Sequence, residues 1–422
     1  MSKWEELLKV LEINIETHNQ FSVGKLVLWY SQYVSKEPPF NLSTTNENKL
    51  IVLKKEISHF LDTVYEIPED KCTDTFEHLG GINAIQYASK KGYDVYLSNV
   101  LKSNKGAVNL TTSGQLTPLH LAAFYGHHLA SKALLEYGAK SSVMTRLKQS
   151  PAYLALSLPP SIRQDERSYL IERKKAIFYD LIADNSGSIF SIDDSANTLA
   201  HIAAENGFID VLEYLLQHSL DLVRMKNHAS HTSLHSAILS NQFDSINVLI
   251  KDNELLAIAD KHGRLPIHYA AMYSNSSMLE SFARAPYLDS LDLNLKTPLI
   301  SAAEQRCNEN VKLLIEKGAN VKSRDQYGRD VLHYAVMTSN SDLAMWLLTH
   351  VDGLNINQKD KYGRTGLMDL LRETKFDSLD IDGFVNDLLK AGAQPDLTDN
   401  DGKSLQDYLD LRFTKHSVKT VV

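Results

Sequence analysis

Histidine recurs at one position of a repeated stretch of this sequence, and its side chain could support catalysis or metal binding. The stretch LTPLHLAAFYGH, from Leu116 to His127, holds His120 between a proline and a glycine. A histidine side chain can act as a general base or bind a metal ion. Histidine recurs at the same place in further copies of the stretch, at His201, His235, His268 and His333. Other residue types fill the same place elsewhere, namely Tyr153, Ile300 and Met368. A catalytic or metal-binding histidine would not recur once per copy or be replaced by isoleucine and methionine, so a structural role is predicted.

A cysteine–histidine pair, Cys72 with His78, is the other arrangement that could support catalysis, because histidine can activate a thiol nucleophile. Nothing nearby supplies an obvious oxyanion hole, and the segment outside the repeats is short for an enzyme domain. The sequence has no GxSxG, HExxH or P-loop motif. We therefore expect a protein that is not an enzyme, with no catalytic residue, cofactor or metal ion. An enzyme with an unrecognised site in the N-terminal domain is kept as an alternative.

The charge and the cysteine content narrow the class of protein. The chain has 422 residues, of which 43% are hydrophobic and 23% are charged, and its net charge is −8. This acidic balance argues against nucleic-acid binding. The two cysteines, Cys72 and Cys307, give neither a zinc spacing nor a disulfide framework, so a reducing compartment fits. We expect a cytoplasmic monomer with no membrane span and no Sec signal at its N-terminus.

The elements that must position these residues repeat along the chain. Nine copies of the opening stretch place their second residues at 83, 117, 150, 198, 232, 265, 297, 330 and 365. The intervals are 34, 33, 48, 34, 33, 32, 33 and 35 residues. Each copy is followed by a second apolar run, such as DVLEYLLQHS or NVKLLIEKGA, whose apolar residues lie three and four positions apart. That spacing predicts amphipathic helices.

The period of about 33 residues, with T-P-L-H-x-A-A followed by x-x-G and then L-L-x-x-G-A, resembles the ankyrin repeat. The resemblance covers roughly residues 80 to 412. It implies two antiparallel helices and a hairpin loop per repeat, stacked into a curved solenoid, so the expected fold class is all-α. It also implies that the repeated histidine makes structural hydrogen bonds between neighbouring loops.

The residues of each unit suit this fold independently of the resemblance. Thr117 can cap the start of a helix, and Pro118 suits the first helical turn, where its missing N–H costs nothing. Gly126 and Gly207 stand where the first helix ends and a left-handed backbone conformation is useful. Asn241 takes that place in its own unit, and asparagine tolerates this conformation better than most residues.

Three regions depart from the period. Residues 1–77 are expected to form an N-terminal helical domain, which either caps the array or binds a partner of its own. The array of about eight or nine repeats spans 78–412, and a tail spans 413–422. An insertion near 159–175 is dense in charge and is read either as a solvated helix extension or as a protruding contact element. The buried residues expected for the insertion helix are Tyr169, Leu170, Ile177, Phe178, Leu181 and Ile182.

The hairpin junctions supply the candidate partner-binding residues. Three junctions read DKHGR, DQYGR and DKYGR and start at Asp260, Asp325 and Asp360. In an ankyrin array the residues between Asp and Gly point from the hairpin tip. Partner contacts are therefore predicted at Lys261, His262, Tyr327 and Tyr362. Tyrosine is a favoured contact residue, although the two tyrosines could instead pack locally. The rival contact residues on first helices are Phe124, Tyr125, Met272 and Tyr273.

The resemblance implies a protein–protein interaction scaffold that binds a protein partner through the concave ankyrin surface. The degenerate repeats, the Asn-, Lys-, Ile- and Ser-rich composition and the missing Sec signal resemble ankyrin-repeat effectors that intracellular bacteria deliver into host cells. The expected role is a secreted virulence effector that binds a host protein in the host cytoplasm. A eukaryotic cytosolic ankyrin adaptor is the alternative.

Overall fold

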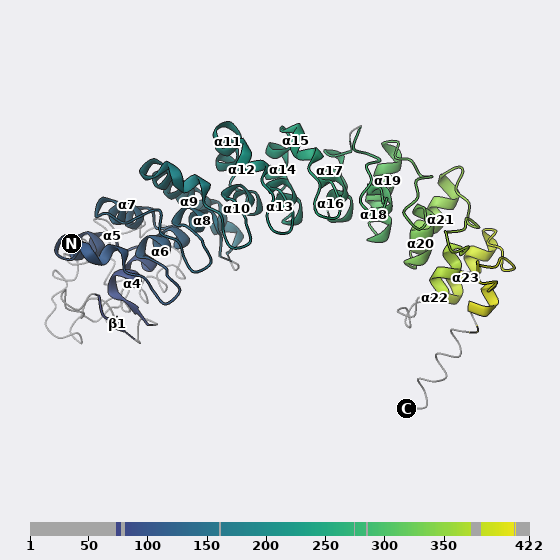
Figure 1. Cartoon of the computed structure of the whole chain (residues 1–422), viewed down its shortest axis with the longest axis horizontal. Coiled ribbons are helices and arrows are strands. Elements are labelled where there is room, and N and C mark those ends of the chain that lie inside the picture. Colours follow the sequence, from purple (N-terminus) through teal and green to yellow (C-terminus); the bar gives the residue numbers. More distant parts are fainter. Residues whose placement is uncertain are drawn as a thin grey trace, which may run out of the picture. The chain divides into compact units, whose positions relative to one another are not determined.

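The described part of the chain is a series of short helices in antiparallel pairs, joined by extended loops (Figure 1). The computed structural model describes residues 73–76, 81–159, 162–273, 275–283, 286–372, 381–408 and 410. These helical pairs confirm the all-α fold class predicted from the sequence. The chain divides into two compact units, Met1–Val211 and Leu212–Val422.

The described part of the first unit begins with a two-stranded ribbon that the sequence pattern did not predict. Strand β1 (Thr75–Phe76) pairs antiparallel with β2 (Ile82–Asn83). The helices that follow are α4 (Ala84–Lys91), α5 (Asp94–Ser103), the 3-10 helix η6 (Lys105–Asn109), α6 (Pro118–Tyr125), α7 (His128–Glu136), α8 (Pro151–Leu156), α9 (Gln164–Asp184), the 3-10 helix η7 (Ser186–Phe190) and α10 (Leu199–Asn206). Helix α11 (Ile209–His218) begins in this unit and ends in the next.

The second unit continues the same alternation of first and second helices. Its helices are α12 (Leu220–Arg224), α13 (Ser233–Leu239), α14 (Phe243–Leu249), α15 (Asn253–Ala257), α16 (Pro266–Tyr273), α17 (Ser276–Glu280), α18 (Pro298–Glu304), α19 (Asn308–Glu316), α20 (Val331–Met337), α21 (Ser341–His350), α22 (Gly366–Arg372) and α23 (Ile381–Lys390).

Each unit has two layers of helices. In the first unit α4, α6, α8 and α10 pack side by side, and α5, α7 and α9 form the other layer. In the second unit α13, α16, α18, α20 and α22 pack in sequence, as their order in Figure 1 shows. Small residues such as Ala122, Ala123, Ala270 and Ala271 are fully buried in these first helices. Small side chains let neighbouring helices approach closely while keeping the interior densely packed.

The helix ends follow the residue types expected from the sequence. Thr117 caps α6 by accepting a hydrogen bond from the backbone N–H of His120, and Pro118 begins the helix. Gly126 ends α6 with a φ of 74°, and Gly207 ends α10 with a φ of 78°. Asn241 adopts the same left-handed conformation, with a φ of 54°. All of these local predictions are confirmed.

The insertion forms the front part of α9, a single helix of 21 residues. The predicted burial of Ile177, Phe178, Leu181 and Ile182 is confirmed, whereas Leu170 is only partly buried. The predicted burial of Tyr169 is wrong, because its side chain is 68% exposed. At 100° per residue, Tyr169 lies about 140° around the helix from Lys174. Lys174, which is fully buried, marks the centre of the buried face.

Some predictions fall on residues that the structure does not describe. These include most of the N-terminal region 1–77, with Cys72 and His78, and the tail 413–422. In the described part of the chain, no helix is both long enough and apolar enough to cross a membrane.

Candidate partner-binding surface

At His120 and His268, the repeated histidine links its own helix to the loop of the next repeat. The backbone N–H of Thr117 donates to Nδ1 of His120 over 3.1 Å. Nδ1 is therefore an acceptor, and Nε2 carries the proton and donates to the carbonyl oxygen of Gln149 over 3.1 Å. His268 bridges in the same way to the carbonyl oxygen of Lys296, over 3.2 Å. The structural hydrogen bonds implied by the resemblance are confirmed at these two positions.

Replacing His120 by alanine is expected to lower the free energy of unfolding by about 1 kcal/mol at pH 7, the contribution of a typical hydrogen bond. Burial lowers the pKa of His120 from 6.5 to about 4. The unfolded chain therefore takes up the proton first as the pH falls. The stability that His120 contributes is complete above pH 6.5 and is lost as the pH approaches 4.

Urea unfolding of the wild type and of His120→Ala at pH 7 and pH 5 measures this contribution. The difference between the two proteins should be smaller at pH 5. An equal difference at both pH values would contradict the assignment. Stoichiometric zinc in the wild type that is lost in the variant would overturn the structural role itself.

A buried aspartate organises five hairpins of the second unit, whereas Asn227 takes this place in the hairpin 227–231. One carboxylate oxygen of Asp325 accepts the backbone N–H groups of Tyr327 and Arg329, over 2.9 and 2.8 Å. Asp260 and Asp360 do the same in their own hairpins. Burial alone would raise the pKa of Asp260, but the backbone N–H of Arg264 and the hydroxyl of Tyr269 outweigh it and lower the pKa to about 2. The carboxylate of Asp260 is therefore charged and turned inward.

Main-chain hydrogen bonds join each of these hairpins to the next. Each bond runs from the backbone N–H just after the aspartate to the carbonyl at the tip of the preceding hairpin. The four bonds are Leu293 to His262 (2.9 Å), Gln326 to Asn294 (2.8 Å), Lys361 to Tyr327 (2.7 Å) and Asn400 to Tyr362 (2.9 Å). We call the linked hairpins, each taken with the residue before its aspartate (259–264, 291–296, 324–329, 359–364 and 398–403), the hairpin rim. Such a linked surface holds its tip side chains in fixed positions.

The two predicted tip tyrosines lie together on this rim. The rings of Tyr327 and Tyr362 are stacked, with centroids 6.3 Å apart and planes at 29°. The guanidinium groups of Arg329 and Arg364 lie over these rings, 5.3 and 4.4 Å from the centroids. Even so, Tyr327 is 38% exposed and Tyr362 is 50% exposed. The two tyrosines therefore pack against each other and still leave part of each ring exposed to a partner.

The remaining predicted contact residues are divided between the two units. Lys261 and His262 are exposed on the first hairpin of the rim, and Tyr273 is exposed at the end of α16. Met272 is only 7% exposed, so a partner could reach little of its side chain. In the first unit Phe124 is half-buried, while Tyr125 is exposed at the end of α6.

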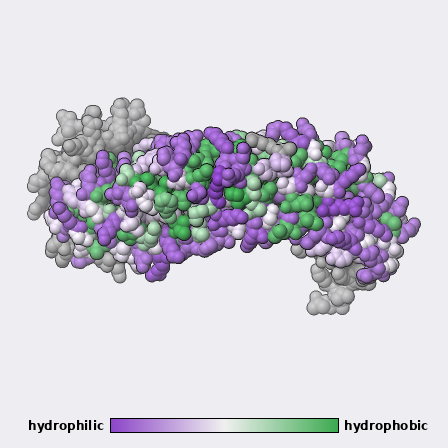
Figure 2. All heavy atoms as spheres, turned by 45° about the horizontal axis from the view of Figure 1, so that its top comes forward, coloured by the Kyte–Doolittle hydropathy of each residue, from purple (hydrophilic) through white to green (hydrophobic). Residues whose placement is uncertain are grey.

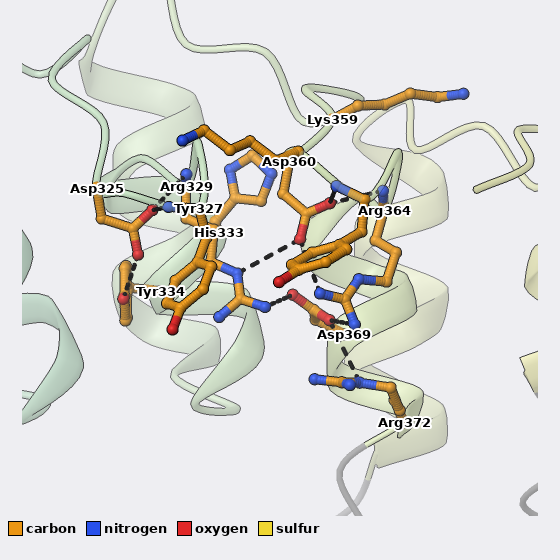
Figure 3. A network of polar contacts seen from close by, with 12 residues as sticks. Asp325, Tyr327, Arg329, His333, Tyr334, Lys359, Asp360, Arg364, Asp369 and Arg372 are labelled. Carbon is orange, nitrogen blue, oxygen red and sulfur yellow. Dashed lines mark hydrogen bonds and ion pairs between the residues drawn. The ribbon is translucent and has the colours of Figure 1, made fainter. Parts of the chain in front are cut away.

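An ionic cluster beneath the tyrosines was missed by the sequence analysis (Figure 3). Asp369, on α22, is almost fully buried. Its carboxylate lies 2.8 Å from Nη2 of Arg329, 3.3 Å from Nη1 of Arg364 and 3.6 Å from Nε of Arg372. Asp360 also pairs with Nη2 of Arg364, over 3.0 Å. The cluster ties the hairpin that carries Tyr327 to the repeat that carries Tyr362.

A sequence signal for this cluster exists in the hairpins themselves. Nine positions after the hairpin aspartate, three repeats have a tyrosine whose hydroxyl donates to that aspartate. These pairs are Tyr269 with Asp260, Tyr334 with Asp325 and Tyr408 with Asp399. The repeat that begins at Asp360 has Asp369 at this position instead. A buried carboxylate at this position, close to the hairpin aspartate, needs cations nearby, so Asp369 predicts arginines or lysines around itself.

Lys174 is the second group that the sequence analysis missed. Its Nζ donates hydrogen bonds to the carbonyl oxygens of Ala123, Leu154 and Ser157, over 3.2, 2.9 and 2.6 Å. The ammonium group also lies 5.3 Å from the ring centroid of Phe124. The last carbonyls of a helix lack partners within the helix, and Lys174 supplies a donor to those at the end of α8. Burial lowers the pKa of Lys174 to about 7.

Two observations on the described residues bear on a metal or small-molecule site. Within these residues, no three His, Cys, Asp or Glu side chains lie close enough together to hold a metal ion. A groove between α9 and the start of α11 has a volume of about 250 Å³, below the range of about 300–1,000 Å³ typical of ligand pockets. Figure 2 shows hydrophobic residues in separate patches among hydrophilic ones on the face it draws, so hydropathy alone does not identify a contact surface.

Models of known protein families match most of the repeat region. The model described as "Ankyrin repeats (3 copies)" matches residues 169–260, 253–325 and 311–399. The model described as "Ankyrin repeat" matches residues 115–146. The matched segments fall on the helical pairs and hairpins described above.

Curated relatives share part of this region. The chain is 27% identical over 179 residues to a transient receptor potential cation channel subfamily A member 1 homolog from Caenorhabditis elegans, covering 41% of this chain and 14% of that protein. It is 29% identical over 185 residues to the B-cell lymphoma 3 protein homolog of Mus musculus, covering 42% of this chain and 41% of that protein. It is 25% identical over 247 residues to the NAD-dependent deacetylase sir2B of Dictyostelium discoideum, covering 56% and 31%. The chain thus spans less than half the length of each of these relatives.

Among solved structures, the ankyrin repeat domain of Bcl-3 matches with 23% sequence identity and a TM-score of 0.43. The match covers 51% of this chain and 95% of that domain.

Proposed function

Because the chain belongs to the ankyrin-repeat family, we propose that it is a protein-binding scaffold whose contact surface is the hairpin rim of the second unit. The observation that carries the proposal is the stacked, partly exposed pair Tyr327 and Tyr362 on neighbouring linked hairpins. Tyrosine buries a large area on binding and loses little side-chain entropy. The main-chain bonds between hairpins reduce that entropy cost further, because the surface is already ordered before the partner arrives.

Lys261 and His262 extend the proposed surface at the first hairpin of the rim. Tyr273, Phe124 and Tyr125 stay in the proposal as rival contacts, and Met272 is left out because it is buried. The scaffold needs no catalytic residue or cofactor in this proposal. An enzymatic site near Cys72 and His78 is the alternative in a different class, and a Cys72-dependent activity would support it.

Two cellular roles fit a scaffold of this kind, an adaptor in a eukaryotic cytosol and an effector delivered by a bacterium to bind a host protein. The relatives named above come from a nematode, a mouse and a social amoeba, which supports the adaptor role more than the effector role. The source of the chain separates the two roles directly.

The double variant Tyr327→Ala, Tyr362→Ala is expected to bind its partner about 30-fold more weakly, which corresponds to about 2 kcal/mol. The partner is first identified by pull-down and mass spectrometry with the full chain, and affinity is then measured by calorimetry. The melting temperature should change little, because both rings lie at the surface and neither is part of the helical core.

The matched control is Tyr169→Ala, which removes an exposed tyrosine from α9 in the first unit. Unchanged affinity is expected for this variant. If Tyr169→Ala weakens binding and the double variant does not, the contact surface lies on the insertion helix. If the double variant melts at a much lower temperature, the two rim tyrosines are structural.

A further inference from the structure

We propose that the hairpin rim binds an acidic segment of its partner: an extended chain in which Asp or Glu residues stand beside leucine-like or aromatic side chains. This inference rests on the proposed function, because it names the chemistry of the partner for the same surface. Three observations carry it: the charge of the hairpins, the direction in which the carboxylates point, and the leucines exposed between the cations.

The hairpins of the second unit have a charge opposite to that of the chain. Together, the segments 259–264, 291–296, 324–329, 359–364 and 398–403 contain nine Lys and Arg residues and six Asp residues, a net charge of +3. The whole chain has a net charge of −8. A local excess of cations on an acidic protein attracts acidic partners and speeds their association.

The positions of the side chains make this contrast stronger at the surface. The aspartate that begins each hairpin is buried: Asp260, Asp292, Asp325, Asp360 and Asp399. Their carboxylates accept N–H groups of their own loops, so their charge is directed inward. Within the hairpins, all of which the structure describes, Asp401 is the exposed carboxylate. The exposed cations are Lys261, Arg324, Lys361 and Lys403.

The second hairpin of the rim, 291–296, has three exposed leucines. It follows the hairpin of Lys261 and precedes the hairpin of Arg324. Leu293 is 70% exposed, and Leu291 and Leu295 are about half exposed. Leu295 has a φ of 59°, at the position that glycine occupies in the hairpins before and after it. The same left-handed conformation occurs at this hairpin position in Gln115, Lys148, Ala196 and Ser230. The three exposed leucines, and not the backbone conformation, therefore make this hairpin an apolar surface beside the cations.

The rim therefore presents apolar and aromatic side chains with lysines at either side, Lys261 before Leu293 and Lys361 beside Tyr362. Arg329 and Arg364 are already paired with Asp360 and Asp369 and hold the surface in shape. A neutral apolar peptide would leave the lysines without partners. A basic peptide would be repelled. An acidic segment with apolar side chains satisfies both features of the surface.

The test is a selection of peptides on the full chain. A random library of short peptides is panned on the wild type, on the rim variant Lys261→Glu, Lys361→Glu, and on the control Lys102→Glu, Lys132→Glu. The control reverses two exposed lysines of the first unit. The wild type and the control should both enrich peptides with Asp or Glu beside Leu, Phe, Tyr or Trp. A selected peptide should bind the rim variant at least about tenfold more weakly, and its affinity should fall as salt rises.

Neutral or basic selected peptides, or acidic peptides that bind the rim variant unchanged, would overturn the inference. So would the absence of any enriched peptide, or tighter binding of single-stranded poly-uridine RNA than of any peptide. Two further results separate an error in the proposed partner chemistry from an error in the proposed function. If Tyr327→Ala, Tyr362→Ala loses the pulled-down partner while no acidic peptide is selected, the rim binds a partner and only the partner chemistry is wrong. If acidic peptides bind that tyrosine variant as tightly as the wild type, the tyrosines are not the contact.

Discussion

Lys174→Glu is expected to lower the free energy of unfolding of the first unit by about 3–5 kcal/mol, the cost of leaving a buried charge without a partner. The three atoms that surround Nζ of Lys174 are carbonyl oxygens, which donate nothing to a carboxylate. A glutamate would lose water and gain only acceptors. Its side chain could reach solvent only if α9 moved away from α6 and α8.

Urea unfolding and amide hydrogen exchange in α8 and α9 measure this effect. The control is Lys132→Glu, an exposed lysine on α7, for which a change within about 0.5 kcal/mol is expected. Lys174→Met keeps most of the volume and removes the charge, so its cost should be smaller than that of the glutamate. If Lys174→Glu is as stable as Lys132→Glu, the ammonium group does not hold α9 in place.

The same variants report the protonation of Lys174. Burial lowers its pKa from 10.5 to about 7, so between these values the unfolded chain binds the proton and the folded chain releases it. Stability due to this residue therefore rises as the pH rises from 7 toward 10.5. The stability of the wild type relative to Lys174→Met should increase over this window.

The sequence predicted the repeats well because their signals are local and occur many times. Thr117, Pro118 and Gly126 each meet a backbone requirement of a single helix, its start or its end. The same residue types recur in other repeats. Lys174 could not be predicted in this way. Its burial depends on carbonyls of α6 and α8, which its own helix does not encode. The helical pattern did contain one clue, since Lys174 lies between Leu170 and Phe178 on the face that is buried.

The candidate site was predicted in part for a similar reason. The Asp-x-x-Gly-Arg pattern identified the hairpin tips, and with them Tyr327 and Tyr362 as neighbours. It did not indicate that Arg329 and Arg364 lie over the rings of these tyrosines, because a guanidinium after the glycine can turn toward its own loop or toward the next repeat. Arg329 turns toward the next repeat, where Asp369 accepts its guanidinium, whereas Arg264, whose next repeat has Ser301 at the equivalent position, pairs with Asp260 of its own loop.

Asp369→Ala is expected to lower the free energy of unfolding of the second unit by about 3–5 kcal/mol, the cost of breaking a buried ion pair. The side chains of Arg329 and Arg364 are 12% and 9% exposed, so neither can turn to solvent when its carboxylate is removed. Asp360 would remain as a partner for both arginines, and one carboxylate would then face two buried guanidinium groups. The stacked tyrosines above the cluster should lose their fixed position as well.

Two matched variants show whether the carboxylate or the packing is responsible. Asp369→Tyr introduces the residue that the equivalent position has in the repeats of Asp260 and Asp325, where its hydroxyl donates to the hairpin aspartate over 2.8 Å. Asp369→Tyr should therefore cost less stability than Asp369→Ala.

Asp369→Phe fills the same space without the hydroxyl, so this variant should be less stable than Asp369→Tyr by about 1 kcal/mol or more. Asp352→Ala, at an exposed aspartate of the same unit, is the control and should change little in urea unfolding. Equal stability of Asp369→Ala and Asp352→Ala would show that the arginines do not need Asp369.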